Sequence, residues 1–233
     1  MATADYQERR AAIEDYFDRT AADVWARLTS EEPVSGIRET VRRGREQMRN
    51  LLLSWLPDDL AGKTVLDAGC GTGVIAIELA HRGAQVVAVD LSRSLIELAQ
   101  DRYADLPEYQ RIEFVVGDMR AIDDRRFDHV LAMDSIIHYE PAHGVQTIER
   151  LAASVEESMV FTFAPRTAPL AAMHAIGKLF PRGDRSPAIE PVSPRQLSER
   201  LSQSRALFDW RQGRTERVSS GFYTSQAMEL IRL

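Results

Sequence analysis

A glycine-rich segment carries the clearest chemical signal in the chain. It reads Val-Leu-Asp-Ala-Gly-Cys-Gly-Thr-Gly over residues 65–73, between an apolar run and an amphipathic stretch. Glycines permit backbone angles that side chains forbid and let a ligand approach the main chain closely. The helix start beyond the loop favours a negative group, whereas Asp67 suits a positive one. The segment therefore predicts a site for a ligand that bears both charges, beside Gly69, Cys70 and Gly71.

The spacing of the glycines separates two kinds of ligand. A dinucleotide fingerprint is G-x-G-x-x-G or G-x-G-x-x-A, but here Val74 stands where the third small residue would be. This departure weakens the interpretation as a pyrophosphate loop. The ammonium and carboxylate of a methionine moiety match the charges better, which indicates S-adenosylmethionine as the cofactor.

Two further acidic residues follow apolar runs. Asp90, before Leu91, ends one run at a point where a carboxylate can accept both hydroxyls of a ribose. Asp118 and Met119 end the next run, where they suit the amino group and the ring face of an adenine. The alternative is ordinary turn chemistry, since Asp and Gly are frequent in turns. Three such ends in succession favour one adenosyl ligand.

The run at residues 130–133 ends in Met133, which is predicted to contact the cofactor, and continues into Asp-Ser-Ile-Ile-His-Tyr over residues 134–139. Ligands of doubly wound sheets lie beyond the carboxyl ends of the strands. His138 is therefore a candidate for the reaction centre, although a lone histidine can equally be a packed, hydrogen-bonded core residue. The segment lacks an Asn-Pro-Pro-Tyr motif, which disfavours nucleic-acid amino groups as acceptors.

Short apolar runs alternate with amphipathic stretches from residue 63 onward, a pattern typical of a parallel sheet wound with helices. We predict a doubly wound, Rossmann-like α/β sheet of seven strands, mostly parallel with an antiparallel last strand. Residues 1–61 are predicted to form an N-terminal helical cap, and residues 62–233 the main domain, with an insertion at 165–194 after the fifth strand. The predicted strands cover 64–67, 85–90, 112–116, 130–133, 159–164 and a final pair within 208–233. The predicted helices of the main domain cover 73–82, 92–104, 145–155 and 194–203, with Thr72 and Ser92 as caps.

Composition narrows the location and the partners. The chain has 233 residues, 44% of them hydrophobic, a net charge of −6 and a single cysteine, Cys70. An acidic chain disfavours nucleic acid as a partner, and one cysteine allows no internal disulfide. No stretch approaches the roughly 18 apolar residues of a spanning helix. We expect a cytoplasmic protein whose membrane contact, if any, is peripheral.

Six segments carry a family resemblance that extends over nearly the whole chain: residues 16–20, 25–27, 41–45, 134–139, 163–167 and 176–181. Together they resemble the magnesium-protoporphyrin O-methyltransferases, class I methyltransferases of bacteriochlorophyll synthesis. The resemblance implies methyl transfer from S-adenosylmethionine to a propionate of magnesium-protoporphyrin IX, giving the monomethyl ester and S-adenosylhomocysteine. It also implies work beside magnesium chelatase, whose porphyrin-carrying subunit would hand over the substrate.

The resemblance also implies roles for individual residues. His138 would orient the propionate with support from Tyr139, while Arg166, Ile137 and Phe180 would contact the porphyrin. The magnesium would arrive inside the substrate, so no metal site is expected in the protein. The chain departs from the chlorophyll-type pattern in having Thr29 where those relatives carry a tyrosine, and Glu140 between the His-Tyr pair and Pro141.

Three alternatives remain open from the sequence. The chain could methylate another small carboxylate, phenol or amine. It could bind S-adenosylmethionine as a regulatory module without turnover. The least favoured alternative is a dinucleotide-dependent oxidoreductase, which the Val74 position disfavours.

Overall fold

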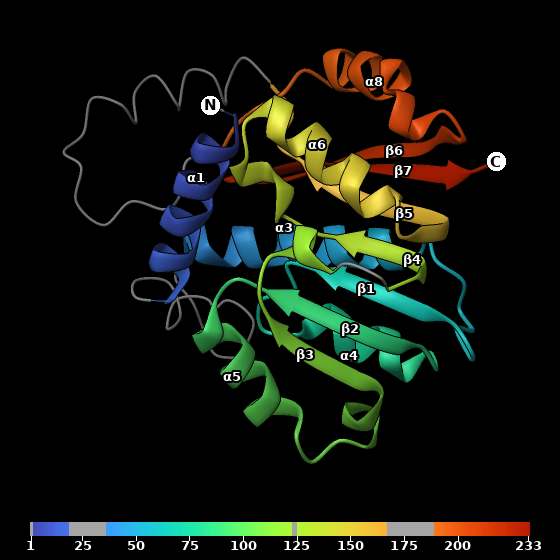
Figure 1. The fold of residues 1–233 in the computed structure, drawn as a ribbon. Coiled ribbons are helices and arrows are strands. Elements are labelled where there is room, and N and C mark those ends of the chain that lie inside the picture. The colour runs from blue at the N-terminus through green and yellow to red at the C-terminus, as the bar shows by residue number, and fades with distance from the viewer. Residues whose placement is uncertain (1, 19–35, 123–124, 167–188) are drawn as a thin grey trace.

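The computed structural model describes residues 2–18, 36–122, 125–166 and 189–233. A seven-stranded sheet with the order β3-β2-β1-β4-β5-β7-β6 forms its centre (Figure 1). β1 to β5 are mutually parallel, and β7 runs antiparallel to both β5 and β6. The predicted fold class is confirmed. The strands are β1 (Thr64–Ala68), β2 (Gln85–Asp90), β3 (Ile112–Val116), β4 (Phe127–Ala132), β5 (Val155–Phe163), β6 (Trp210–Ser220) and β7 (Tyr223–Arg232).

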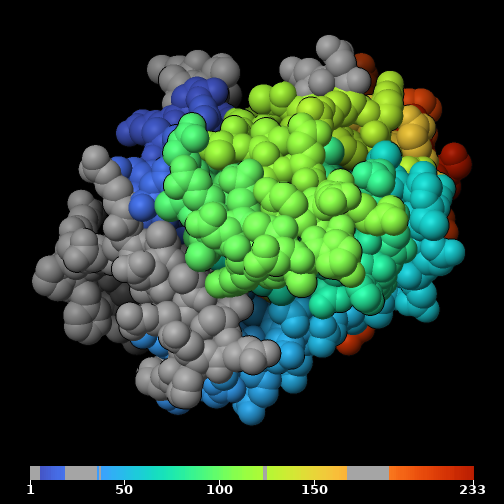
Figure 2. Space-filling model, turned by 90° about the horizontal axis from the view of Figure 1, so that it is seen from below, coloured from blue at the N-terminus to red at the C-terminus, as the bar shows by residue number. Residues whose placement is uncertain are grey.

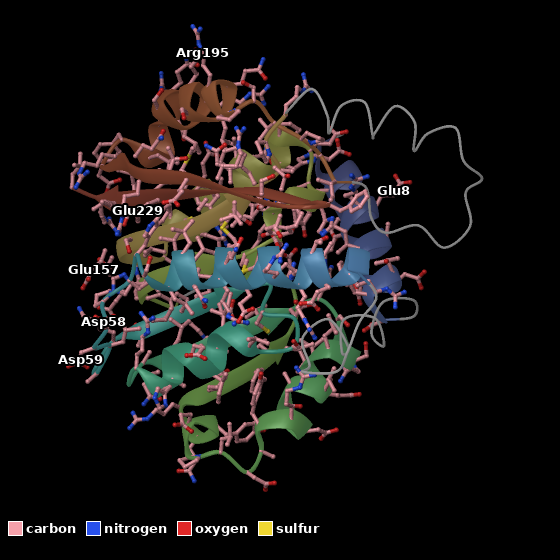
Figure 3. All side chains as sticks on the ribbon, turned by 180° about the vertical axis from the view of Figure 1, so that it is seen from behind. Glu8, Asp58, Asp59, Glu157, Arg195 and Glu229 are labelled. Atoms are coloured by element: carbon pink, nitrogen blue, oxygen red, sulfur yellow. The ribbon has the colours of Figure 1, made fainter. Side chains whose placement is uncertain are left out.

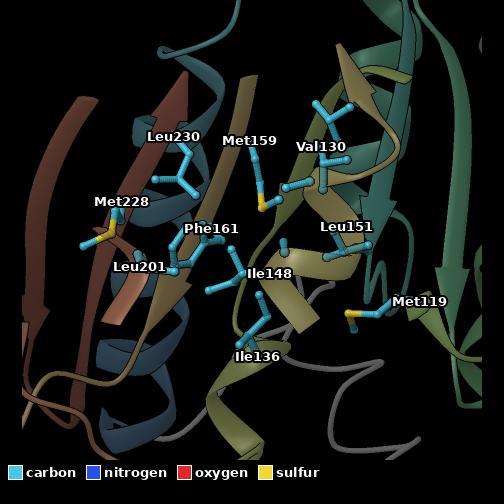
Figure 4. Packing of buried hydrophobic residues seen from close by; sticks show 14 of the residues in the cluster. Met119, Val130, Ile136, Ile148, Leu151, Met159, Phe161, Leu201, Met228 and Leu230 are labelled. Carbon is cyan, nitrogen blue, oxygen red and sulfur yellow. The ribbon is translucent and has the colours of Figure 1, made fainter. Parts of the chain in front are cut away.

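Helices cover both faces of the sheet. One face packs against α3 (Gly36–Leu53), α4 (Val74–His81) and α5 (Arg93–Tyr103). The other packs against α6 (Pro141–Ala152) and α8 (Pro194–Gln203), as Figure 4 shows for Ile148 and Leu151 of α6 beside Met159 and Phe161 of β5. α1 (Ala2–Tyr16) lies outside both layers, across the end of the sheet at which the parallel strands finish (Figure 1).

That end of the sheet holds the switch point of the topology. The chain winds from β1 outward to β3 and then returns to place β4 on the other side of β1. Open α/β sheets bind ligands in the crevice beyond such a point, at the carboxyl ends of the strands. In Figure 3, Glu8 of α1 marks this end, and Asp58, Asp59 and Glu157 mark the opposite end.

Two glycines let α3 approach the β6–β7 hairpin closely. A Cβ atom on Gly44 would come within 2.6 Å of the Tyr223 ring, and one on Gly221 within 2.5 Å of the Thr40 hydroxyl. Gly221 also has a φ of 57°, which a turn of this kind needs and most side chains resist. The close approach brings one face of α3 to the edge where ligands bind.

Several predicted boundaries differ from the structure. α6 begins at Pro141, four residues before the predicted start, because proline is well tolerated in the first turn of a helix. β5 begins at Val155, earlier than the predicted start at residue 159. The prediction missed this part of the strand because Glu156 and Glu157 are exposed and interrupt the apolar run. Ser92 does cap α5 by accepting from the Leu95 N–H, but the residue before α4 is Gly73, so the prediction of Thr72 as a cap is wrong.

Candidate active site

A cavity of about 540 Å³ opens beyond the carboxyl ends of β1, β2 and β4. Its walls come from the glycine loop, the segments after β2, β3 and β4, and the inward faces of α1 and α3. Cavities of this size commonly hold small molecules and cofactors. Most of the predicted site residues line it, namely Gly69, Cys70, Gly71, Asp90, Leu91, Met119, Met133, His138 and Tyr139.

The glycine loop forms a tight turn between β1 and α4. Gly69, Gly71 and Gly73 have φ values of 85°, 53° and 74°, so all three need the left-handed region. Gly69 is also sterically required, since a Cβ there would come within 2.3 Å of the Ser135 Cβ. The Gly69 and Cys70 N–H groups both donate to the Val89 carbonyl, at 2.8 and 3.0 Å. These contacts tie the loop to β2 and expose its main chain to the cavity.

Asp67 is a buried carboxylate with no good partner. Its side chain is fully enclosed, and neither carboxylate oxygen accepts a hydrogen bond of normal geometry from the described residues. Burial, together with the charge of Asp90, raises its pKa from 3.8 to about 8, and the Ala76 N–H offsets this only in part. A buried acceptor without a donor is costly. Asp67 does not itself line the cavity, but it lies two residues before Gly69, which does. A cation bound beside the loop would supply the missing partner, so the residue fits an ammonium group.

Asp90 differs from Asp67, because both of its carboxylate oxygens accept hydrogen bonds from main-chain N–H groups. One oxygen accepts from the Gly71 N–H at 2.8 Å and the other from the Ser92 N–H at 2.9 Å. Burial raises the pKa of Asp90, and these two hydrogen bonds oppose the rise. Each carboxylate oxygen can accept more than one hydrogen bond, so Asp90 keeps capacity for the hydroxyls of a ligand.

Asp118 is held by α1. Both of its oxygens accept from the Tyr6 hydroxyl, at 3.0 and 2.9 Å, and one accepts from the Arg120 N–H at 2.9 Å. Burial and the charge of Asp118 raise the pKa of Tyr6 to about 12, and the Arg120 guanidinium stacks over the Tyr6 ring at 4.1 Å. Asp118 itself does not line the cavity, whereas its neighbours Gly117 and Met119 do.

His138 lies in a short 3₁₀ turn after β4 and is buried, with 6% of its surface exposed. Its carbonyl accepts from the Arg9 Nε at 2.8 Å, and its ring packs edge-on against Phe17 with 5.8 Å between centroids. Tyr139 stacks on Tyr6 at 5.2 Å, and burial raises the pKa of its hydroxyl. α1 therefore closes over the His-Tyr pair and forms part of the cavity wall.

The charged face of α3 was not predicted as part of the site. Arg42, Arg45 and Arg49 line the cavity together with Glu39 and Glu46. They recur at intervals of three and four residues and so share one face of the helix. The periodicity was readable from the sequence, but a charged helix face is usually a solvated one, and only the fold turns it toward a cavity.

Asp134 was also not predicted as a site residue. It follows β4 with a φ of 51°, a left-handed conformation that strains residues other than glycine. Its carboxylate accepts hydrogen bonds from four side chains on three different elements. The donors are Arg45 of α3, Thr162 of β5, and Tyr223 and Ser225 of β7.

Two predicted substrate residues, Arg166 and Ile137, do not line the cavity. Arg166 is exposed just after β5, where its N–H donates to the Val192 carbonyl at 3.0 Å. Ile137 does not line the cavity, and its carbonyl accepts from the Glu190 N–H. Phe180 lies outside the described residues, as do Thr29 and most of the predicted insertion.

The described part of the chain holds neither a candidate metal centre nor a membrane-spanning helix. Within the described residues, no three or more His, Cys, Asp or Glu side chains gather in a way that could hold a metal ion. None of the helices in those ranges is long and apolar enough to cross a bilayer.

Comparison with known proteins places the chain in a family. Residues 132–232 match the family model "Magnesium-protoporphyrin IX methyltransferase C-terminus", and residues 65–157 match "Methyltransferase domain". The magnesium-protoporphyrin O-methyltransferase of Rhodobacter capsulatus is 46% identical over 228 residues, which cover 97% of this chain and 98% of that protein. The crystal structure of the Synechocystis magnesium protoporphyrin IX methyltransferase with bound SAH has a TM-score of 0.84 at 28% identity, covering 96% of this chain and 99% of that one.

The predicted family is thus confirmed over almost the full length of both proteins. The glycine loop, the acidic strand ends and the His-Tyr turn all fall within the matched regions. The chain belongs to the magnesium-protoporphyrin O-methyltransferase family of class I methyltransferases.

Proposed function

We propose that this protein transfers a methyl group from S-adenosylmethionine to a propionate carboxylate of magnesium-protoporphyrin IX. The products are the monomethyl ester and S-adenosylhomocysteine. The likeness to the R. capsulatus relative supports the substrate. The observation that carries the cofactor is Asp67, whose buried carboxylate accepts no hydrogen bond of normal geometry from the described residues and which lies directly before the glycine loop that lines the cavity.

The first part of the cofactor site is the glycine loop with Asp67. We assign the methionine ammonium to the Asp67 side of the loop and the methionine carboxylate to the main chain of Gly69, Cys70 and Gly71, near the start of α4. The left-handed glycines leave room for a ligand at the backbone. When bound, S-adenosylmethionine would supply a methyl group on a cationic sulfur, with S-adenosylhomocysteine as the leaving group.

The second part follows β2 to β4. Asp90 would accept the ribose hydroxyls, and Leu91 would pack beside the sugar. Met119 would cover the adenine face. Asp118 would accept a hydrogen bond from the adenine amino group, either in place of the one from the Tyr6 hydroxyl or in addition to it. Met133 would complete the wall near the sulfur.

On the acceptor side, the protein needs to position the propionate more than activate it. A propionate has an ordinary pKa of about 4 to 5 and is already ionised near pH 7, so no general base is required. We assign His138 to hydrogen-bond and orient the carboxylate, and Tyr139 to support it. Both residues are buried, and excluding water favours a reaction in which an anion and a cation neutralise each other.

The remaining proposals rest on the family resemblance. They include a propionate contact by Arg166, porphyrin contacts by Ile137 and Phe180, and a lid formed by residues 1–61 and 165–194. Transfer of substrate from the porphyrin-carrying subunit of magnesium chelatase and peripheral contact with a membrane from the cytoplasm also belong here. The methyl-transfer proposal does not depend on any of them.

The direct test is a methyl-transfer assay with the purified protein, S-adenosylmethionine and either magnesium-protoporphyrin or metal-free protoporphyrin. We expect the magnesium porphyrin to gain one methyl group, seen as a monoester by mass spectrometry, with S-adenosylhomocysteine formed in equal amount. Cofactor binding without transfer to either porphyrin would indicate another acceptor or a regulatory module. Tight binding of NAD in place of S-adenosylhomocysteine would refute the assignment altogether.

A further inference from the structure

Arg45 differs from the other arginines on the cavity face of α3 in how it is held. Arg42 pairs with Glu39 at 2.6 Å and Arg49 with Glu46 at 3.8 Å, both within one turn of the same helix. Those two glutamates are largely exposed, with 47% and 58% of their side-chain surface accessible. Exposed pairs of this kind contribute little to stability. Arg45 instead pairs at 2.6 Å with a buried carboxylate from another element.

That carboxylate, Asp134, is fixed from several sides. The Tyr223 hydroxyl donates to its two oxygens at 3.2 and 3.1 Å, and the Thr162 and Ser225 hydroxyls donate at 3.1 and 3.2 Å. The Asp134 N–H donates in turn to the Thr162 hydroxyl at 2.7 Å. Only 5% of the Asp134 side chain is exposed. The network therefore fixes one N–H of Arg45 and, through it, the direction of the guanidinium.

The oriented guanidinium remains part of the cavity wall. A guanidinium has five N–H donors in a rigid plane and binds carboxylates in a defined geometry. The cavity wall near the His138 turn thus carries a cation whose position is set by the core of the protein. Its chemistry fits an anionic group of the acceptor.

Charge decides which anionic group Arg45 should bind. A carboxylate that attacks a sulfonium loses its negative charge on the way to the transition state. A cation bound to that carboxylate would stabilise the ground state more than the transition state and slow the reaction. A fixed guanidinium is better placed on a carboxylate that keeps its charge throughout.

Protoporphyrin carries two propionates. We propose that Arg45, positioned by Asp134, binds the propionate that is not methylated, and that this contact limits the enzyme to one methyl transfer per porphyrin. The inference rests on the proposed function. After one transfer, a second would require the new ester to lie against Arg45, where it would lose a charge-assisted hydrogen bond.

The test compares two acceptors that differ only at the second propionate: magnesium-protoporphyrin, and the monomethyl ester that carries its methyl group on the propionate that the enzyme does not methylate. For the wild-type protein we expect kcat/KM for the di-acid to exceed that for the monoester by about 10- to 100-fold. The double variant Arg45→Met with Asp134→Asn removes both charges and leaves no uncompensated buried carboxylate. We expect it to have a higher KM for the di-acid, a similar kcat, and a preference reduced to about 3-fold or less.

Three further variants separate charge from position. Asp134→Asn alone keeps the guanidinium but loosens it, so the preference should be intermediate, and Arg45→Lys should retain more of it than the double variant. Arg43→Met is the matched control, because Arg43 lies on the same helix but contacts Ser220 and does not line the cavity. The control should leave the preference unchanged.

Two results would overturn the inference. One is a double variant that keeps the full preference for the di-acid. The other is a loss of S-adenosylhomocysteine affinity equal to the loss of kcat/KM, since Arg45 would then serve the cofactor. If the wild-type protein methylates neither porphyrin, the proposed function fails, and the inference fails with it.

Discussion

Replacing Asp67 by asparagine tests the physical basis of the cofactor site. Burial raises the pKa of Asp67 to about 8, against an ordinary value of 3.8. Above pH 4 the unfolded chain releases this proton while the ligand-free fold keeps it, so the fold loses stability as the pH rises toward 8. At pH 7, roughly three pH units above the pKa of the unfolded chain, the free energy of unfolding is lowered by about 1.4 kcal/mol per unit, or roughly 4 kcal/mol in total.

The substitution would remove this titration but would bring in an amide that also lacks partners, at about 1 to 3 kcal/mol. We therefore expect the ligand-free Asp67→Asn variant to be more stable than the wild type by roughly 1 to 3 kcal/mol at pH 7. Near pH 4 the titration contributes almost nothing, so the cost of the amide remains and the variant should be less stable than the wild type by about 1 to 3 kcal/mol. Urea unfolding at pH 4, 5.5 and 7 measures this directly.

Ligand binding should reverse the ranking. An ammonium beside Asp67 favours the ionised carboxylate, so S-adenosylhomocysteine binding at pH 7 should release about one proton from the wild type. The variant should release none and bind about 10- to 100-fold more weakly. Calorimetry in two buffers of different ionisation enthalpy counts the protons. Equal proton release by both proteins, or an unchanged affinity, would refute the role of Asp67.

Three other predictions follow from contacts around the cavity. His138→Ala should lower kcat by about 10- to 1,000-fold and leave S-adenosylhomocysteine affinity nearly unchanged, because the residue is assigned to the acceptor; an equal loss of cofactor affinity would defeat that assignment. Gly44→Ala should destabilise the fold by about 1 to 3 kcal/mol in thermal unfolding, since its Cβ would meet Tyr223, whereas the Cβ of Gly36→Ala on the same helix meets none of the described residues within 4 Å and should have little effect. Tyr6→Phe should cost about 1 kcal/mol through the lost bond to the carboxylate after β3, and no loss of stability would show that α1 does not depend on it.

Much of the fold could be predicted because its signals are local. The apolar run of β2 was predicted with the observed bounds, and the start of β1 was predicted correctly, since these strands are buried and bounded by glycine or charge. The glycine loop was also predictable, because few residues other than glycine adopt the left-handed conformation that this loop needs next to a cavity.

The missed parts are those that depend on distant pairings. Arg45 and Asp134 are 89 residues apart, and Tyr223 is another 89 beyond Asp134, so no spacing rule connects them. The stripe of charge on α3 looked like a solvated surface because charged helix faces usually are. Only the close approach of α3 to the hairpin, which Gly44 permits, turns that stripe into a cavity wall.

Figure 2 shows the molecule from below, with the blue residues of α1 beside the green residues of α5. Asp18, which follows α1, accepts from the Ser92 hydroxyl at 2.7 Å and from the Ser94 N–H at 3.1 Å. The end of α1 is therefore attached to the start of α5, next to Asp90. This attachment was not predicted either, and it places Asp18 close to the ribose end of the proposed cofactor site.

A crystal structure of the protein with bound S-adenosylhomocysteine tests the central claim most directly. The account predicts one ligand whose ammonium lies on the Asp67 side of the glycine loop, whose ribose hydroxyls meet Asp90, and whose adenine lies beside Met119. A ligand bound elsewhere, or one that leaves any of these strand ends without contact, would contradict it.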